Sequence, residues 1–242
     1  MSSLNISIIY EDNNFLVINK PAGLAIHKDS FNKEEVLTDW IVEKYPECEG
    51  VGEPMKLQNG EVIDRPGIVH RLDKGTTGAL IIAKNQTTYL WLKEAFQRHQ
   101  VKKVYQAIVY GHFKDEKGIV DLPIGRNKND PRKRLAGRGA SGVLRDALTE
   151  YKVLQDFGDY SYLEVFPKTG RTHQIRVHLK AISHPIVCDS LYAEGQKCLP
   201  GLDRPALHAG RLEVETPDGQ KLVLEAPLPT DFQSALEYLR KL

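Results

Sequence analysis

The chain has 242 residues, of which 41% are hydrophobic and 27% charged, and its formal net charge is +1. This is the composition of an ordinary globular protein, long enough to bury a core of useful size. Because the net charge is close to zero, composition gives no global argument for binding nucleic acid, and any site for a polyanion must come from local clusters of cations.

The cysteines and the N-terminus indicate the compartment. Cys48, Cys188 and Cys198 show no C-x-x-C spacing, so neither a zinc site nor a disulfide framework is indicated, and we expect three reduced thiols. No basic region followed by an apolar run opens the chain, and no apolar stretch is long enough to span a bilayer. We therefore expect a cytoplasmic protein that does not enter membranes.

Hydrophobic periodicity and turn residues predict a chain of short strands, many joined as hairpins, with a few helices. In chain order we expect strands at 6–10 and 15–18, a helix at 34–45, a polar loop at 46–62, a strand at 79–83, a helix through 89–96, strands at 103–110, 147–155, 160–166, 207–215 and 221–225, and a helix at 231–242. No repeat or change of composition marks a boundary, so we expect one α+β domain over 1–242.

Asp73 is the first candidate for chemistry, because it lies between two cations, Arg71 and Lys74, just ahead of a buried strand. Taken alone, it could simply form a surface ion pair, which contributes little to stability. The alternative is a nucleophilic or acid-base carboxylate that a cation from a second element keeps ionised.

The segment 166–183 could supply that cation. Thr172 is the expected N-cap of a helix whose buried stripe includes Ile175 and Leu179, while His173 and Arg176 lie on another face. A basic helix N-terminus suits an anion, although a solvated basic face is an equal alternative. No pair of histidines has the spacing of a helical metal site, so we expect no metal.

Two further features are ambiguous by themselves. Tyr105, in the predicted strand 103–110, is an ordinary core or rim aromatic, or a residue that stacks on a base or accepts a proton. The run 126–138 contains six cations and one acid and shows no apolar periodicity. Such a run is usually a solvated loop, but it could also follow a phosphate backbone.

Together and in this order, five segments resemble the successive motifs of the RluA family of pseudouridine synthases. They are YEDNNFLVINKPAGLAIH, GIVHRLDKGTTGALIIAK, KKVYQAIVYG, GRTHQIRVHL and HPIVCDSLY. The resemblance extends from Tyr10 to about Pro229 and implies the pseudouridine synthase catalytic fold, a mixed and mostly antiparallel sheet flanked by helices and loops. It also implies an isomerase that converts uridines of tRNA or rRNA to pseudouridine without a metal or cofactor.

The resemblance assigns roles to individual residues. It implies that Asp73 is the catalytic aspartate, that Tyr105 stacks on the target base and is a candidate for removing its C5 proton, and that Arg176 pairs with the aspartate. It implies that Arg71 fills the space left when the target nucleotide flips out of its stack. The candidates for RNA binding are Arg71, His70, Arg171, His173, Lys168, Arg132, Lys133 and Arg134.

Some features depart from the common pattern of the family. Cys188 and Ala193 stand where glycine is frequent, and Thr77 stands where serine is frequent. We expect no RNA-binding domain ahead of the catalytic domain, so that the loops 46–62 and 126–138 select the RNA, and we expect a monomer.

Two rival functions remain. A glycoside hydrolase would need a second carboxylate, and none stands out in these motifs. A non-catalytic RNA-binding module would not require Asp73, Tyr105 and Arg176 together. The sequence identifies neither the RNA nor the uridine, and it leaves open whether Asp73 attacks the sugar or the base.

Overall fold

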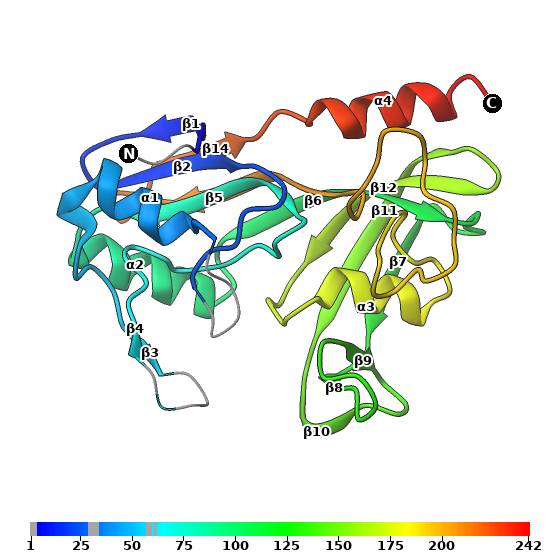
Figure 1. Cartoon of the computed structure of the whole chain (residues 1–242), viewed down its shortest axis with the longest axis horizontal. Coiled ribbons are helices and arrows are strands. Elements are labelled where there is room, and N and C mark those ends of the chain that lie inside the picture. The colour runs from blue at the N-terminus through cyan, green and yellow to red at the C-terminus, as the bar shows by residue number, and fades with distance from the viewer. Residues whose placement is uncertain (1–3, 29–33, 57–59, 61) are drawn as a thin grey trace. The chain divides into compact units, whose positions relative to one another are not determined.

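The computed structural model describes residues 4–28, 34–56, 60 and 62–242. The chain forms two compact units, one from 1–101 with 211–227 and the other from 102–210 with 228–242. Both mix helices with mostly antiparallel strands, which confirms the predicted α+β class (Figure 1). The expectation of a single domain concerns how the units are joined, and it stays a prediction.

The first unit is built on antiparallel strands. Its elements are β1 (Ser7–Glu11), β2 (Phe15–Lys20), α1 (Leu37–Lys44), the 3₁₀ turn η1 (Pro46–Cys48), β3 (Met55–Lys56), β4 (Val62–Ile63), β5 (Thr77–Ala83), α2 (Gln86–Gln97), the second part of β13 (Leu207–Glu215) and β14 (Lys221–Glu225). β2 pairs with both β1 and β5, and β13 pairs with β14. The hairpins predicted at 6–18 and 207–225 are confirmed.

β5 lies at the centre of this unit's core, since all seven of its residues are buried. Strands covered on both faces are continuously apolar rather than alternating, which is why the sequence of β5 reads as one apolar run. Tyr89 and Leu92 of α2 and Phe15 of β2 pack into the same core. This packing fixes the end of the strand that Asp73 precedes.

The second unit contains a larger sheet, a small sheet and two helices. Its elements are β6 (Lys102–Tyr110), β7 (Lys117–Asp121), β8 (Ile124–Arg126), β9 (Arg134–Ala136), β10 (Ser141–Arg145), β11 (Leu148–Asp156), β12 (Tyr160–Pro167), α3 (Gln174–Ala181), the first part of β13 and α4 (Thr230–Leu239). The larger sheet has the order β6-β12-β11-β7 and the small one β10-β8-β9. Residues of β6, β12, α3 and α4 share one core.

The structure differs from the prediction in several places, and it contains β7, β8 and β10, for which no strand was predicted. The helix predicted at 34–45 begins only at Leu37. The predicted loop 46–62 contains η1, β3 and the first residue of β4, and part of it lies outside the described residues. The run 126–138 contains β9, which pairs with β8. Strands of two or three residues are too short to show a period, so periodicity could not reveal them.

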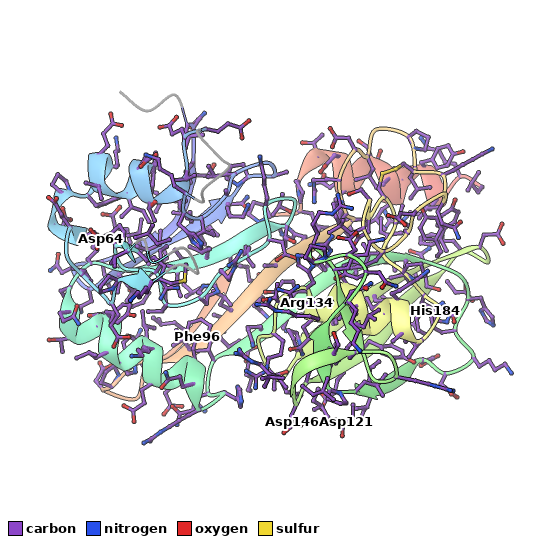
Figure 2. All side chains as sticks on the ribbon, turned by 60° about the horizontal axis from the view of Figure 1, so that its bottom comes forward. Asp64, Phe96, Asp121, Arg134, Asp146 and His184 are labelled. Carbon is purple, nitrogen blue, oxygen red and sulfur yellow. A yellow bond between two sulfur atoms is a disulfide. The ribbon has the colours of Figure 1, made fainter. Side chains whose placement is uncertain are left out.

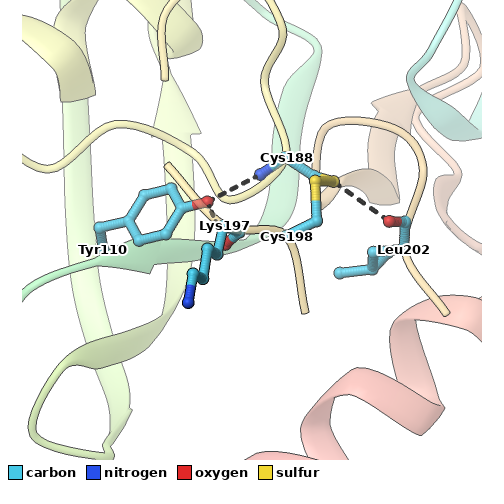
Figure 3. The surroundings of a disulfide bond; sticks show 5 residues. All are labelled: Tyr110, Cys188, Lys197, Cys198 and Leu202. Atoms are coloured by element: carbon cyan, nitrogen blue, oxygen red, sulfur yellow. Dashed lines mark hydrogen bonds between the residues drawn. A yellow bond between two sulfur atoms is a disulfide. The ribbon is translucent and has the colours of Figure 1, made fainter. Parts of the chain in front are cut away.

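The prediction of three reduced cysteines is wrong for two of them. Cys188 and Cys198 form a disulfide across ten residues, with Cα atoms 4.8 Å apart, and Cys48 is a buried free thiol. The Tyr110 hydroxyl accepts from the backbone N–H of Cys188 at 3.4 Å and donates to the carbonyl of Lys197 at 2.9 Å (Figure 3). The loop backbone, which sequence spacing does not reveal, brings the two cysteines together.

We expect Cys198→Ser to lower the free energy of unfolding by about 2–3 kcal/mol, because the crosslink restricts the unfolded chain over a loop of this length. Urea unfolding of wild type and variant, each with and without dithiothreitol, measures this. Reductant should lower the stability of wild type to that of the variant and leave the variant unchanged. Equal stability in all four samples would show that the thiols are reduced.

Gly67 ties the loop before Asp73 to β5. Its φ is +66°, and a Cβ at this position would lie 2.2 Å from the carbonyl oxygen of Ala83. The backbone N–H of Ala83 donates to the carbonyl of Gly67 at 3.0 Å, so neither segment can withdraw without losing this bond.

We expect Gly67→Ala to destabilise the protein by about 2–4 kcal/mol, from backbone strain and this steric conflict together. The matched control is Gly219→Ala, because Gly219 also has a positive φ, +85°, but nothing within 4 Å of an added Cβ. The control should cost only about 1–2 kcal/mol. Equal losses in urea unfolding would mean that the close approach to Ala83 does not constrain the loop.

Candidate active site

Asp73 is half-buried in the loop that leads into β5 of the first unit. Its carbonyl accepts from the N–H of Thr76 at 3.0 Å, which closes a tight turn. The next residue, Lys74, offers its carbonyl to the N–H of Gly23 at 2.9 Å. The Asp73 loop is therefore fastened by its main chain to the Lys-Pro-Ala-Gly loop that follows β2.

Lys20 strengthens this attachment, and the sequence analysis did not identify it as a site residue. Its side chain is fully buried, and its ammonium donates to the carbonyls of Pro21, Leu24 and Lys74 at 2.8, 2.9 and 3.2 Å. A buried ammonium needs such acceptors, since burial without them is costly. The available signals were a lysine at the end of an apolar strand and its place in the YEDNNFLVINKPAGLAIH motif.

The residues beside Asp73 have different surroundings. Arg71 is exposed. Lys74 forms an ion pair with Glu34 at 2.9 Å. The Nε2 atom of His70 accepts from the N–H of Ile81 at 3.0 Å, and its ring stacks on Phe96 with centroids 4.5 Å apart. His70 thus connects the loop to β5 and α2, while Arg71 is exposed.

Arg176 is a buried and firmly held cation of the second unit. It lies on α3 and is only 6% exposed, and Asp189 is 1% exposed. Nε and Nη2 of Arg176 donate to the two carboxylate oxygens of Asp189 at 2.6 and 2.8 Å. This two-point contact holds the plane of the guanidinium, so its remaining donors have a fixed direction. A solvated basic face at this position is therefore excluded for Arg176.

Asp189 and Tyr192 complete a network that the sequence analysis did not predict. The N–H groups of Leu191 and Tyr192 donate to the carboxylate of Asp189 at 3.0 and 3.2 Å. The ring of Tyr192 lies 5.1 Å from the guanidinium of Arg176, and its hydroxyl is 3.0 Å from Nδ1 of His173. Both residues belong to the HPIVCDSLY motif, which was the only signal for them.

The start of α3 also differs from the prediction. Its N-cap is His173, with φ of +58°, and not Thr172. The side-chain oxygen of Gln174 accepts from the N–H of Arg171 at 3.0 Å and from the hydroxyl of Thr169 at 2.7 Å. A glutamine inside the helix thus organises the loop, a role that preferences at the N-cap position do not reveal.

Tyr105 lies on β6 opposite Val165 of β12, half-buried against the core of the second unit. Lys103 is on the same face of β6 and donates to the carbonyl of Thr169 at 3.0 Å. Burial lowers the pKa of Lys103 to about 8. Lys103 therefore connects β6, the strand that carries Tyr105, to the loop before α3.

A basic pocket of about 620 Å³ lies in the second unit between the small sheet and the loop before α3. Four arginines line it: Arg126, Arg134, Arg145 and Arg171. The rest of the lining is Ile124, Gly125, Gly142, Val143, Gly170 and Thr172. Arg134 and Arg171 were predicted to bind RNA, whereas Arg126 and Arg145 were not. Strands β8 and β10 place these two beside the predicted pair.

Three more of the predicted RNA-binding cations have acidic partners. Arg132 pairs with Asp130 at 2.8 Å and holds the pKa of that carboxyl at about 2. Lys133 pairs with Glu194 at 2.8 Å, and Lys168 forms an ion pair at the same distance. The partner of Lys168 is Glu150 of β11. These cations are therefore partly neutralised.

The candidate residues are divided between the units. His70, Arg71 and Asp73 belong to the first unit, and the others, including Tyr105 and Arg176, belong to the second. The pairing of Asp73 with Arg176 thus stays a prediction. Among the described residues, no group of three or more His, Cys, Asp or Glu side chains could hold a metal. No helix in the described ranges is long and apolar enough to cross a membrane.

Comparison with known proteins identifies the family. The family model of RNA pseudouridylate synthases matches residues 14–181. An uncharacterized RNA pseudouridine synthase of Synechocystis sp. is 37% identical over 99% of this chain and 70% of its own length. The ribosomal large subunit pseudouridine synthase D of Borreliella burgdorferi is 38% identical over 88% of this chain, which spans 62% of that relative.

A solved structure agrees with these matches. The human RNA pseudouridylate synthase domain containing 4 has a TM-score of 0.75 and 28% identity, covering 97% of this chain and 93% of that one. The chain therefore belongs to the RNA pseudouridylate synthases and, as its motifs predict, to their RluA family.

Proposed function

We propose that the protein isomerises specific uridines of tRNA or rRNA to pseudouridine, with Asp73 as the catalytic carboxylate and Arg176 as its cationic partner. The observation that carries this proposal is the fixed guanidinium of Arg176, buried and held at two points by Asp189. A buried cation with one orientation is suited to stabilise a carboxylate through a reaction that occurs away from water.

The chemistry requires one nucleophile and one proton acceptor. The carboxylate of Asp73 attacks the target nucleotide, and the glycosidic bond between N1 of uracil and C1′ of ribose breaks. The uracil rotates, a bond forms between C5 and C1′, and the bond to Asp73 breaks. N1 takes up a proton and the C5 proton leaves. Tyr105 is our candidate to stack on the base and accept that proton. The isomer has the same atoms as the substrate, so no oxidant, reductant or cofactor is consumed.

The enzyme must reach a bond inside folded RNA, so the target nucleotide has to leave its stack. Arg71 is exposed next to the Asp73 loop and has the planar group that could fill the vacated space. We propose RNA contacts for His70, Arg171, His173, Lys168, Arg132, Lys133 and Arg134 as well. A relative named as a ribosomal large subunit synthase supports rRNA as one substrate class.

Two details of the proposal concern the cell. We propose that the protein works in the cytoplasm and as a monomer. The rival glycoside hydrolase is disfavoured because Asp189, the buried carboxylate near Arg176, has both oxygens engaged by the guanidinium. A carboxylate held in this way is a poor general acid, whereas a hydrolase of that type needs one.

We expect Asp73→Asn to abolish the release of tritium from RNA labelled at uridine C5, by a factor of at least about 10³, because removal of a nucleophile leaves little residual rate. Labelled tRNA and rRNA are assayed separately with wild type and variant. Lys74→Gln, next in sequence and also polar, is the control and should retain most activity. Equal release by wild type and Asp73→Asn would exclude Asp73 as the nucleophile.

We expect Asp189→Asn to lower the free energy of unfolding by about 3 kcal/mol or more, because it leaves the buried cation of Arg176 without its main counter-charge. Urea unfolding measures the loss. The control is Glu94→Gln, which removes the exposed partner of Arg98 and should cost less than about 0.5 kcal/mol. Similar small losses in both variants would mean that Arg176 does not depend on Asp189.

A further inference from the structure

The basic pocket of the second unit contains Arg126 and Arg145, to which the proposed function assigns no role, beside Arg134 and Arg171. Its walls come from β8, β9, β10 and the loop before α3, and no acidic side chain lines it. Arg134, which is labelled in Figure 2, belongs to β9 and lines this pocket. The pocket therefore concentrates positive charge in a protein whose net charge is only +1.

Two of the four arginines are held in place by main-chain acceptors. Arg134 donates to the carbonyls of Pro131 and Lys133, both at 3.1 Å. Nε of Arg171 donates to the carbonyl of Asp146 at 3.0 Å. A guanidinium has five N–H donors, so each of these side chains is oriented while donors remain for a ligand.

The other two arginines differ from these in their surroundings. Among the residues that the structure describes, neither Arg126 nor Arg145 forms an ion pair with a carboxylate, and both are exposed. Arg132, close by in sequence, is neutralised by Asp130. Repulsion among four guanidinium groups is relieved when an anion enters the pocket, and this favours binding.

We propose that this pocket binds phosphodiester groups of the RNA strand that flank the target nucleotide. Planar guanidinium groups bind the oxygens of a phosphate at two points. A volume of about 620 Å³ accommodates more than one phosphate group, as a passing strand requires. Gly142 and Gly170 contribute no side chains to the walls, so the strand can approach the backbone there.

The pocket is joined to the surroundings of Arg176 within the same unit. The N–H of Arg134 donates to the Tyr192 hydroxyl at 2.8 Å, and the ring of Tyr192 packs on Arg176. A strand that binds in the pocket is thus positioned relative to Arg176 by β9 and Tyr192. The four arginines are positioning residues, which set where the RNA lies and take no part in bond breaking.

The inference rests on the proposed function, since its ligand is RNA. The test, however, measures RNA binding and not isomerisation. We would compare Arg126→Gln/Arg145→Gln with the control Arg98→Gln/Arg240→Gln, which removes the same charge at exposed positions outside the pocket. Fluorescence anisotropy with labelled unfractionated tRNA, and separately with labelled rRNA, gives Kd between about 50 and 200 mM KCl. All measurements are repeated in Asp73→Asn.

We expect the pocket variant to weaken binding at least about tenfold near 100 mM KCl and to reduce the slope of log Kd against log salt by about 1–2 relative to the control, because each lost phosphate contact reduces it by roughly 0.7–0.9. We expect the same difference in Kd and slope between the pocket and control variants in the Asp73→Asn background. This difference does not depend on whether Asp73→Asn abolishes tritium release. Failure of the catalytic proposal is therefore distinguishable from failure of this one.

Identical slopes and affinities in the pocket and control variants would overturn the inference. A second arm adds inorganic phosphate, without RNA, at constant ionic strength and follows Tm. Phosphate that stabilises wild type but not the pocket variant, with RNA binding equal in both, would assign the pocket to a free phosphate and would also overturn it.

Discussion

The two-point ion pair between Arg176 and Asp189 is the interaction on which the second unit's part of the site depends. Each side chain would be costly to bury alone, and the pair is tolerated because the carboxylate also accepts two backbone N–H groups. Arg176 comes from α3, whereas Asp189 comes from the loop after it. The pair therefore fixes the loop as well as the cation, and Tyr192 and its contacts with His173 follow from that loop.

In the first unit, the group to be held in position is the carboxylate of Asp73, which lies in a loop. Main-chain bonds to Gly23, the buried ammonium of Lys20 and the close approach of Gly67 to β5 all restrain the loop of Asp73. None of these contacts uses the carboxylate itself. A nucleophile is effective when its position is fixed before the substrate arrives, and this arrangement provides that without engaging the reacting oxygens in those contacts.

Much of the fold could be predicted, because strong signals were local. β5 is buried on both faces, and the hairpins of β11 with β12 and of β13 with β14 are marked by turn residues. The motifs identified Asp73, Tyr105 and Arg176 as candidates and led to the family. The Cys188–Cys198 disulfide, β9 and the N-cap of α3 were missed because they depend on contacts between loops or on strands too short to have a period.

The sequence predicted the candidate reacting groups of the site but not the residues that hold them in place. Lys20 reaches the carbonyl of Lys74, and Asp189 and Tyr192 contact Arg176, which is distant from both in sequence. A charged or aromatic side chain in a motif does not reveal such a partner. The basic pocket illustrates the same limit. Arg126 and Arg145 come from separate strands, and only the pairing of β8 with β10 brings them together.

The most direct test of the account is the coupling free energy between Asp73 and Arg176, because the mechanism requires these residues of different units to act together. Urea unfolding of Asp73→Asn, Arg176→Met and the double variant gives it as a double-mutant cycle, in which the loss of the contact with Asp189 cancels. The account predicts a favourable coupling of about 1–3 kcal/mol. Strictly additive losses would contradict the pairing on which the proposed mechanism depends.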